Sequence, residues 1–224
     1  VLRHEHKYTD GIEDAAHGVH QCAKTANLGI SHAEGQYLMF CTADHLLAPS
    51  YLMHLVNILD HMPEPLSAAI MLGYCHYLKR DVGGEFVDWL AEADTFGITP
   101  GADKGSNEAW QPYPRYERFM RDGMATLLRC PDWRGIDGFD SALRRDHCLL
   151  LDEEFEGQGH EALDWCYRQT TTMGSTFWCS PLLQLYHQPH EEVRQEAQWR
   201  HELEISTAMF TRKHGEAAWA RAIG

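Results

Sequence analysis

The chain has 224 residues and a formal net charge of −14, from 19 basic and 33 acidic residues. This length fits one domain with a substantial core, and 44% hydrophobic residues with seven tryptophans are typical of a globular protein. The acidic balance argues against a duplex-binding surface, which needs clustered lysine and arginine, and against a polybasic membrane patch. No apolar run approaches the roughly 18 residues of a membrane helix.

The seven cysteines are irregularly spaced, and none of them forms a CxxC pair. An odd number without a regular framework is typical of reduced thiols, so we expect a cytoplasmic protein. The sequence shows no initiator methionine and no signal peptide. Its first residues, 1–3, resemble the end of a strand that is already under way.

The first third of the sequence predicts helix, strand, helix and strand. Apolar residues at helical spacing predict a helix over 13–33, with Val19, Cys22, Ala23 and Ala26 on one face. The apolar run 37–41 predicts a short buried strand. A second helix is expected to begin at 48–50 and end before Pro63, with an inner face made of Leu52, Leu55, Val56 and Leu59. The run 68–78 predicts another strand.

The remaining two thirds alternate in the same way. The predicted order is an irregular segment over 94–116, a short helix over 117–129, a helix that starts near Glu161, a last strand over 182–186, and helix from Glu191 onward. A long irregular segment inside a compact domain is usually functional or mobile. Alternating strands and helices favour an α/β sheet.

An acidic residue, Asp44, follows the strand predicted over 37–41. Ligands in open α/β sheets gather at the carboxyl ends of strands, and a carboxylate there can hold a hard metal ion that in turn holds a diphosphate. The alternative is a surface aspartate that caps the following helix. We interpret the neighbouring His45 as a loop residue rather than a ligand.

Three segments together resemble GT-A-type glycosyltransferases of the family 2 kind: Asn27-Leu28-Gly29-Ile30 ahead of the strand that ends near Asp44, the stretch 151–168, and Tyr186-His187-Gln188-Pro189. The second and third segments resemble galactosyltransferase-like and chondroitin-synthase-like enzymes. The resemblance runs from about Asn27 to His190. It implies a mixed sheet flanked by helices over 1–190, followed by a helical extension over 191–224, and an absent N-terminal nucleotide-binding unit.

The resemblance also implies a donor site. Asp44 and His187 are the expected ligands of Mn²⁺ or Mg²⁺, with His190 as the weaker alternative to His187, since imidazole can join carboxylate and diphosphate oxygens around such ions. The residues expected at the donor diphosphate are Asn27, Asp44, Arg144 and Arg145. For the arginines, a structural pairing role is the alternative.

An acceptor site is implied by the stretch 151–168. Glu161 is expected to act as the base that takes the proton from the attacking hydroxyl, although a helix N-terminus also favours acids electrostatically. Asp164, one turn later on the same face, supports the acceptor or holds the helix in place. Trp165 and Trp110 are candidate acceptor contacts, with core burial as the alternative for Trp165.

The sequence departs from the family pattern at Thr42 and Ala162, where acids are expected. Three functions therefore stay open. The first is metal-dependent transfer of a sugar from a nucleotide-sugar, a UDP-sugar by preference, to a hydroxyl of a glycan or other acceptor. The second is a degenerate, non-catalytic sugar- or nucleotide-binding relative. The third is another metal-dependent enzyme acting on phosphates, such as a nucleotidyltransferase.

Overall fold

The computed structural model describes residues 22–42, 45–62, 69–77, 99–100, 128–129, 140–155, 160–187 and 196–223. The helices are α2 (Cys22–His32), α3 (Tyr51–Asp60), α6 (Glu161–Met173), α7 (Glu196–His214) and α8 (Glu216–Ile223), with one 3₁₀ turn at Arg145–His147. The strands are β1 (Tyr37–Met39), β2 (His45–Leu47), β3 (Ala69–Tyr77), β4 (Thr99–Pro100), β5 (Leu128–Arg129), β6 (Ser141–Arg144) and β7 (Thr176–His187).

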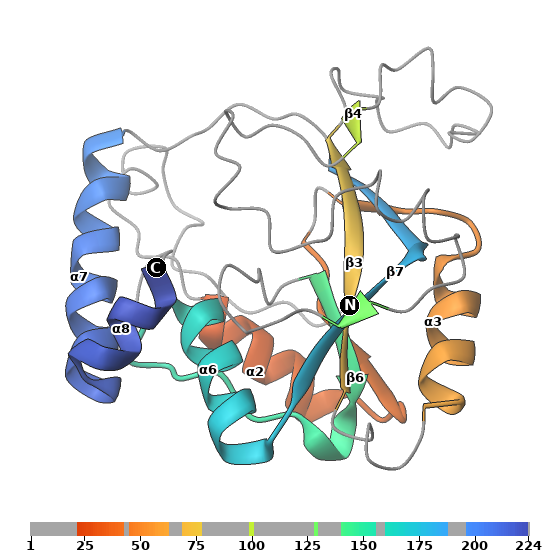
Figure 1. Ribbon diagram of the computed structural model, residues 1–224, viewed down its shortest axis with the longest axis horizontal. Coiled ribbons are helices and arrows are strands. Elements are labelled where there is room, and N and C mark those ends of the chain that lie inside the picture. Colours follow the sequence, from red (N-terminus) through yellow and green to blue (C-terminus); the bar gives the residue numbers. More distant parts are fainter. Residues whose placement is uncertain are drawn as a thin grey trace.

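All of these strands belong to one mixed sheet with the order β1-β6-β3-β7-β2, in which β4 pairs with β3 and β5 pairs with β7. The central pair, β3 and β7, is parallel, and the other pairs are antiparallel. Helices α2 and α6 lie on one side of the strands and α3 lies on the other (Figure 1). The predicted mixed α/β sheet flanked by helices is confirmed.

Each face of the sheet has its own apolar core, because successive side chains of a strand point to opposite faces. Ile70 belongs to the cluster under α2 and α6, whereas Met71 belongs to the cluster under α3. Leu143 and Ala142 of β6 divide in the same way. The predicted extension over 191–224 contributes to the first core, since Phe210 of α7 is fully buried in it.

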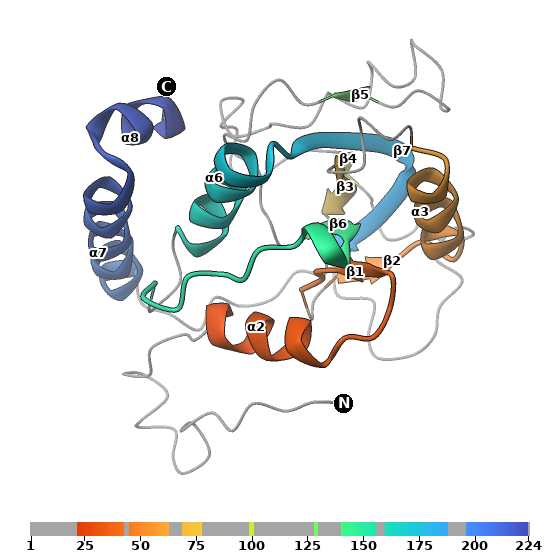
Figure 2. The ribbon, with the colours of Figure 1, turned by 90° about the horizontal axis from the view of Figure 1, so that it is seen from below.

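Strand β7 is longer than the sequence indicated and is bent, as Figure 2 shows. Its pairing with β3 shifts between Leu72 and Tyr74, which pair with Cys179 and Gln184 respectively. Pro181 lies within the extra residues of β7, and proline, which has no N–H to donate, is found in sheets at such irregularities. The bend lets one strand pair with β5 in its first half and with β2 at its end.

The helix predicted from 48–50 onward exists as α3, but its inner face differs from the prediction. Leu55 and Leu59 are buried as expected, together with Tyr51. Leu52 and Val56 are instead 56% and 43% exposed. The buried set follows an i, i+4, i+8 spacing, which gives a narrower stripe than the predicted one.

Two further predictions are corrected. Residues 128–129, expected at the end of a helix, form strand β5, and the strand predicted over 37–41 ends at Met39. The first part of the helix predicted over 13–33 and the irregular segment 94–116, apart from β4, lie outside the described residues.

Candidate active site

The chain crosses the sheet directly after β1. Strands β1 and β2 are neighbours in sequence but lie at opposite ends of the strand order, so residues 40–44 connect the β6 side to the β7 side. Phe40 N donates to Ser141 O at 2.8 Å, and His45 N donates to Thr42 O at 3.3 Å. Ala43 and Asp44 lie outside the described residues, but both of their chain neighbours, Thr42 and His45, are placed.

His45 is a strand residue rather than the loop residue we predicted, because it begins β2. Its Nδ1 lies 2.5 Å from Oδ1 of Asp140, the residue that directly precedes β6. Only 5% of the His45 side chain and 7% of the Asp140 side chain are exposed. This pair links the start of β2 to the residue before β6.

Two hydroxyl groups near this pair are buried without a hydrogen-bond partner in the part of the chain that the structure describes: Thr42 Oγ1 and Tyr51 OH. Burial raises the pKa of the Tyr51 phenol, and electrostatic interactions with Asp140 and Cys41 raise it further. The phenol therefore stays protonated and able to donate. We call Thr42, His45, Tyr51 and Asp140 the crossover site.

The end of β7 meets the crossover site. His187 is the register partner of His45 in the β2–β7 pair and of Tyr77 in the β3–β7 pair. Directly opposed residues of antiparallel strands have Cβ atoms about 4.5 to 5.5 Å apart. The side chain of His187 lies outside the described residues, and no group of three or more metal-binding side chains occurs among those that are described.

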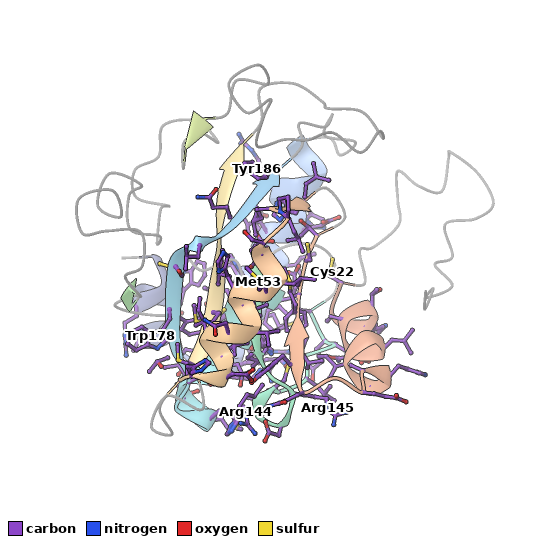
Figure 3. The ribbon with its side chains drawn as sticks, turned by 90° about the vertical axis from the view of Figure 1, so that its right-hand side faces the viewer. Cys22, Met53, Arg144, Arg145, Trp178 and Tyr186 are labelled. Atoms are coloured by element: carbon purple, nitrogen blue, oxygen red, sulfur yellow. The ribbon has the colours of Figure 1, made fainter. Side chains whose placement is uncertain are left out.

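The two arginines expected at the diphosphate lie at the other end of the sheet. Arg144 pairs with Tyr37, at the start of β1, whereas Asp44 follows the end of that strand. Figure 3 shows Arg144 and Arg145 at one end of the strands and Tyr186 at the other. Arg144 binds Asp146, which lowers the pKa of that carboxyl. These positions do not support contact with a diphosphate at Asp44.

Arg145 and Asn27 have structural partners. Arg145 Nη1 donates to Ala33 O at 2.7 Å. Asn27 is 8% exposed and its amide donates to Leu151 O and Glu153 Oε1, each at 2.9 Å, while its oxygen accepts from Leu151 N at 2.8 Å. Asn27 thus joins α2 to the segment before α6. Because Leu151 and Glu153 are far from Asn27 in the sequence, the motif around Asn27 could not reveal this role.

The two acids of α6 are both buried, with Glu161 3% exposed and Asp164 fully buried. Asp164 uses both carboxylate oxygens inside the protein: Arg168 Nε donates to Oδ2 at 2.7 Å, and His214 Nε2 lies 2.6 Å from Oδ1. Of the two roles left open for Asp164, this geometry favours holding the helix in place over contact with an acceptor.

Trp165 is buried at 2% exposure and donates from Nε1 to Leu149 O at 2.8 Å. Its ring packs edge-on against Phe40, with centroids 5.4 Å apart. This is the burial alternative, so Trp165 offers no open face to a sugar. Glu161 lies one turn earlier, and residues four apart on a helix share a face. The contact therefore brings α6 toward Phe40, the first residue after β1. Trp110 lies outside the described residues.

A set of charged side chains joins the last turn of α7 to the segment before α6 and to α6 itself. Lys213 Nζ lies 2.5 Å from Asp152 Oδ2 and 3.0 Å from Glu154 Oε2. Partial burial opposes ionisation of Asp152, but hydrogen bonds from Lys213 and from Glu154 N outweigh it and lower the pKa of that carboxyl. We call this set the ionic clamp; its members are Asp152, Glu154, Asp164, Arg168, Arg212, Lys213 and His214.

Comparison with known proteins finds a match in structure but not in sequence. No family model matches the chain, and no curated protein sequence matches it. The fold is similar to that of GalNAc-T7, solved with UDP, GalNAc and Mn²⁺, with a TM-score of 0.51 and 16% sequence identity. The chain has a GT-A-type fold. The match covers 88% of this chain and 38% of the GalNAc-T7 chain.

Among the described residues of this GT-A-type chain, no helix is long and apolar enough to cross a membrane. Sequence reasoning found the strand that precedes Asp44 and the helix that carries Glu161. It missed Asp140, Tyr51 and His214, and it misassigned His45. The sequence signal for Asp140 was weak, because a single acid before an apolar strand resembles any loop residue.

Proposed function

We propose that the chain is a metal-dependent glycosyltransferase domain that moves a sugar from a nucleotide-sugar, preferably a UDP-sugar, to a hydroxyl of a glycan or other acceptor. The observation that carries the proposal is the crossing of the chain between β1 and β2, at the carboxyl end of β1. Asp44 lies in that crossing, and the position of His187 is opposite that of His45. The GT-A-type fold supports the same assignment.

The residues at this edge suit a divalent metal ion such as Mn²⁺. A carboxylate at Asp44 and an imidazole at His187 would form a mixed oxygen and nitrogen donor set, which such ions accept. The buried Thr42 hydroxyl, which makes no hydrogen bond to any described residue, provides a further polar group beside it. When bound, the metal would neutralise the charge of the leaving diphosphate.

Glu161 is the proposed base on the acceptor side. Its carboxylate would accept the proton of the attacking hydroxyl, a contribution that is typically worth 10²- to 10⁴-fold in rate. Its burial at the first position of α6 supports this role, together with the contact of Trp165 in the same helix with Phe40, which directly follows β1. Asp164 holds α6 in place through Arg168 and His214.

A non-catalytic relative is the second candidate, and specific observations favour it. Thr42 and Ala162 stand where the family pattern has acids, and the nearby Asp164 is occupied by two internal partners. A domain of this kind would bind a nucleotide or a sugar without transferring it.

Release of UDP from UDP-GalNAc and UDP-glucose, with and without Mn²⁺ and with a panel of sugar acceptors, distinguishes the two candidates. The transferase proposal predicts Mn²⁺-dependent release that falls at least about 100-fold in Glu161→Gln, while UDP binding is retained. Glu153→Gln, an exposed acid of the same segment, is the matched control and should change little. Binding of UDP without release from either donor would overturn the transferase proposal in favour of the non-catalytic relative.

A further inference from the structure

The connection from β6 to α6 is held by side chains rather than by regular secondary structure. Residues 148–155 belong to no helix or strand, yet Leu151 and Phe155 are only 5% and 2% exposed. The backbone groups of a buried segment need hydrogen-bond partners. Figure 2 shows this segment running between α6 and α2, and side chains of both helices supply those partners. We call residues 147–155 the strap.

Helix α6 binds three carbonyl groups of the strap. The donors lie at i, i+3 and i+4 of the helix, so they share one face: Trp165 Nε1 to Leu149 O at 2.8 Å, Arg168 Nη1 to Leu150 O at 2.9 Å, and Gln169 Nε2 to His147 O at 3.2 Å. Sliding the helix along the strap by one residue would break all three bonds. The strap therefore fixes the position of α6 along its own axis.

Helix α2 binds the strap one residue further on, through Asn27. The Asn27 oxygen accepts from Leu151 N at 2.8 Å and its amide donates to Leu151 O at 2.9 Å, so the side chain takes up both backbone groups of that residue. The amide also donates to Glu153 Oε1 at 2.9 Å. Because α6 binds residues 147–150 and Asn27 binds the next part of the strap, the strap ties α6 to α2.

The helix that the strap fixes begins with Glu161, the proposed base, which is 3% exposed. A general base must lie within about 2.6 to 3.2 Å of the group whose proton it takes, and a displacement of about 1 Å can lower a rate about 100-fold. We propose that Asn27 is a positioning residue for Glu161: it anchors the strap to α2, and the strap fixes α6. This inference rests on the proposed function, because that function makes Glu161 the base.

The test measures kcat and KM for the nucleotide-sugar, at a temperature below the unfolding midpoint of every variant. Asn27→Ala is expected to lower kcat about 10- to 100-fold and to leave KM unchanged, because the Asn27 amide is occupied by internal partners. Ser31→Ala removes a hydrogen bond that stays within α2; it is the matched control and should change neither quantity. Trp165→Phe removes the donor to Leu149 O but keeps an aromatic ring, and it replaces Asn27→Ala in the test if that variant does not fold.

The double variant gives a readout that two independent structural roles would not produce. Asn27→Ala and Trp165→Phe act on the same strap, so their effects on kcat should not multiply, and the double variant should fall little below Asn27→Ala alone. An unchanged kcat in folded Asn27→Ala would overturn the inference. So would a double variant whose loss equals the product of the two single losses, or a raised KM with normal kcat in Asn27→Ala, which would place Asn27 at the donor.

Hydrogen exchange separates this inference from the proposed function. In Asn27→Ala the amide of Asp164, which donates to His160 O in the first turn of α6, should exchange about 10-fold faster, while the amides of β3 and β7 keep their rates. Absence of sugar transfer by the unmodified chain would overturn the proposed function, and exchange at Asp164 would still decide whether Asn27 fixes α6. Faster exchange in Asn27→Ala but not in Ser31→Ala supports that role, and equal exchange in both variants overturns it.

Discussion

The crossover site and the ionic clamp both contain buried polar side chains, but they satisfy them differently. In the ionic clamp, both oxygens of Asp152 and of Asp164 are occupied by partners within the protein, although Nη2 of Arg168 is buried without a hydrogen-bond partner among the described residues. In the crossover site, the hydroxyls of Thr42 and Tyr51 find no hydrogen-bond partner among the described residues.

The difference is consistent with our proposal that the ionic clamp stabilises the fold and the crossover site belongs to a binding region. A buried polar group without a partner costs about 1 to 3 kcal/mol, and native proteins keep few of them, often at sites of function. The acids that the sequence pattern groups together, Asp44, Glu161 and Asp164, therefore belong to different kinds of region. Asp164 lies in the ionic clamp, and Asp44 lies in the connection that forms the crossover site.

The largest loss of stability is expected in the ionic clamp, where a substitution at Asp164 tests whether this region is structural. Asp164→Ala leaves the charge of Arg168 and the ring of His214 without their shared partner, so we expect the free energy of unfolding to fall by about 3 to 5 kcal/mol. Urea denaturation measures this loss. Unchanged stability combined with lost transferase activity would show that Asp164 is catalytic rather than structural.

The pH dependence of stability tests the same region through His160, which contacts Thr207 of α7. Burial lowers the pKa of His160 from 6.5 to about 4. At pH values between these limits the unfolded chain binds more protons at this residue than the folded chain does, so acidification destabilises the fold. The stability from this residue is complete above pH 6.5 and is lost as the pH falls toward 4, by up to about 3 kcal/mol. Urea denaturation at pH 7 and pH 4.5 should show a smaller fall in His160→Gln, and an equal fall in both proteins would contradict the assignment.

Lys213→Ala addresses the partly exposed portion of the ionic clamp. Lys213 pairs with Asp152 and Glu154, and 20% of its side chain is exposed, so solvent screens the interaction. We expect a loss of about 1 kcal/mol in the free energy of unfolding, smaller in 1 M NaCl because salt screens such pairs. A loss as large as that of Asp164→Ala would mean that the pair is more shielded from solvent than its exposure indicates.

The smallest effect is expected at the crossover site and has the opposite sign. Tyr51→Phe removes a buried hydroxyl that no described residue satisfies, so stability should stay the same or rise by about 1 kcal/mol. If the hydroxyl serves the bound state, affinity for Mn²⁺ and UDP should fall at the same time. Thermal unfolding and calorimetry on the same sample measure both. Marked destabilisation would show that Tyr51 has a structural partner.

Local patterns in the sequence were enough to predict much of the fold. The apolar run 37–41 and the helix that starts near Glu161 correspond to β1 and α6, because helical and strand periodicity are read within a few residues. The exposed face of α3 was misjudged, since Leu52 and Leu55 are equally apolar and only the packing against β7 and β6 decides which of them is buried.

The pairing of distant polar residues could not be predicted. His45 and Asp140 are 95 positions apart, and Asp164 and His214 are 50 positions apart. No local spacing links such residues, and the topology that brings the start of β2 close to the start of β6 is a property of the whole chain. The sequence therefore indicated the strand that precedes the proposed metal ligand, but not the polar pairs that the fold brings together from distant positions.

Calorimetric titration with UDP, in the presence and absence of Mn²⁺, tests the central claim most directly. The account predicts binding that requires Mn²⁺, that is abolished in Asp44→Ala, and that persists in Asp146→Ala at the opposite end of the sheet. Binding of UDP that is independent of Mn²⁺, or that survives Asp44→Ala unchanged, would contradict the assignment of a metal-dependent donor site to the crossing between β1 and β2.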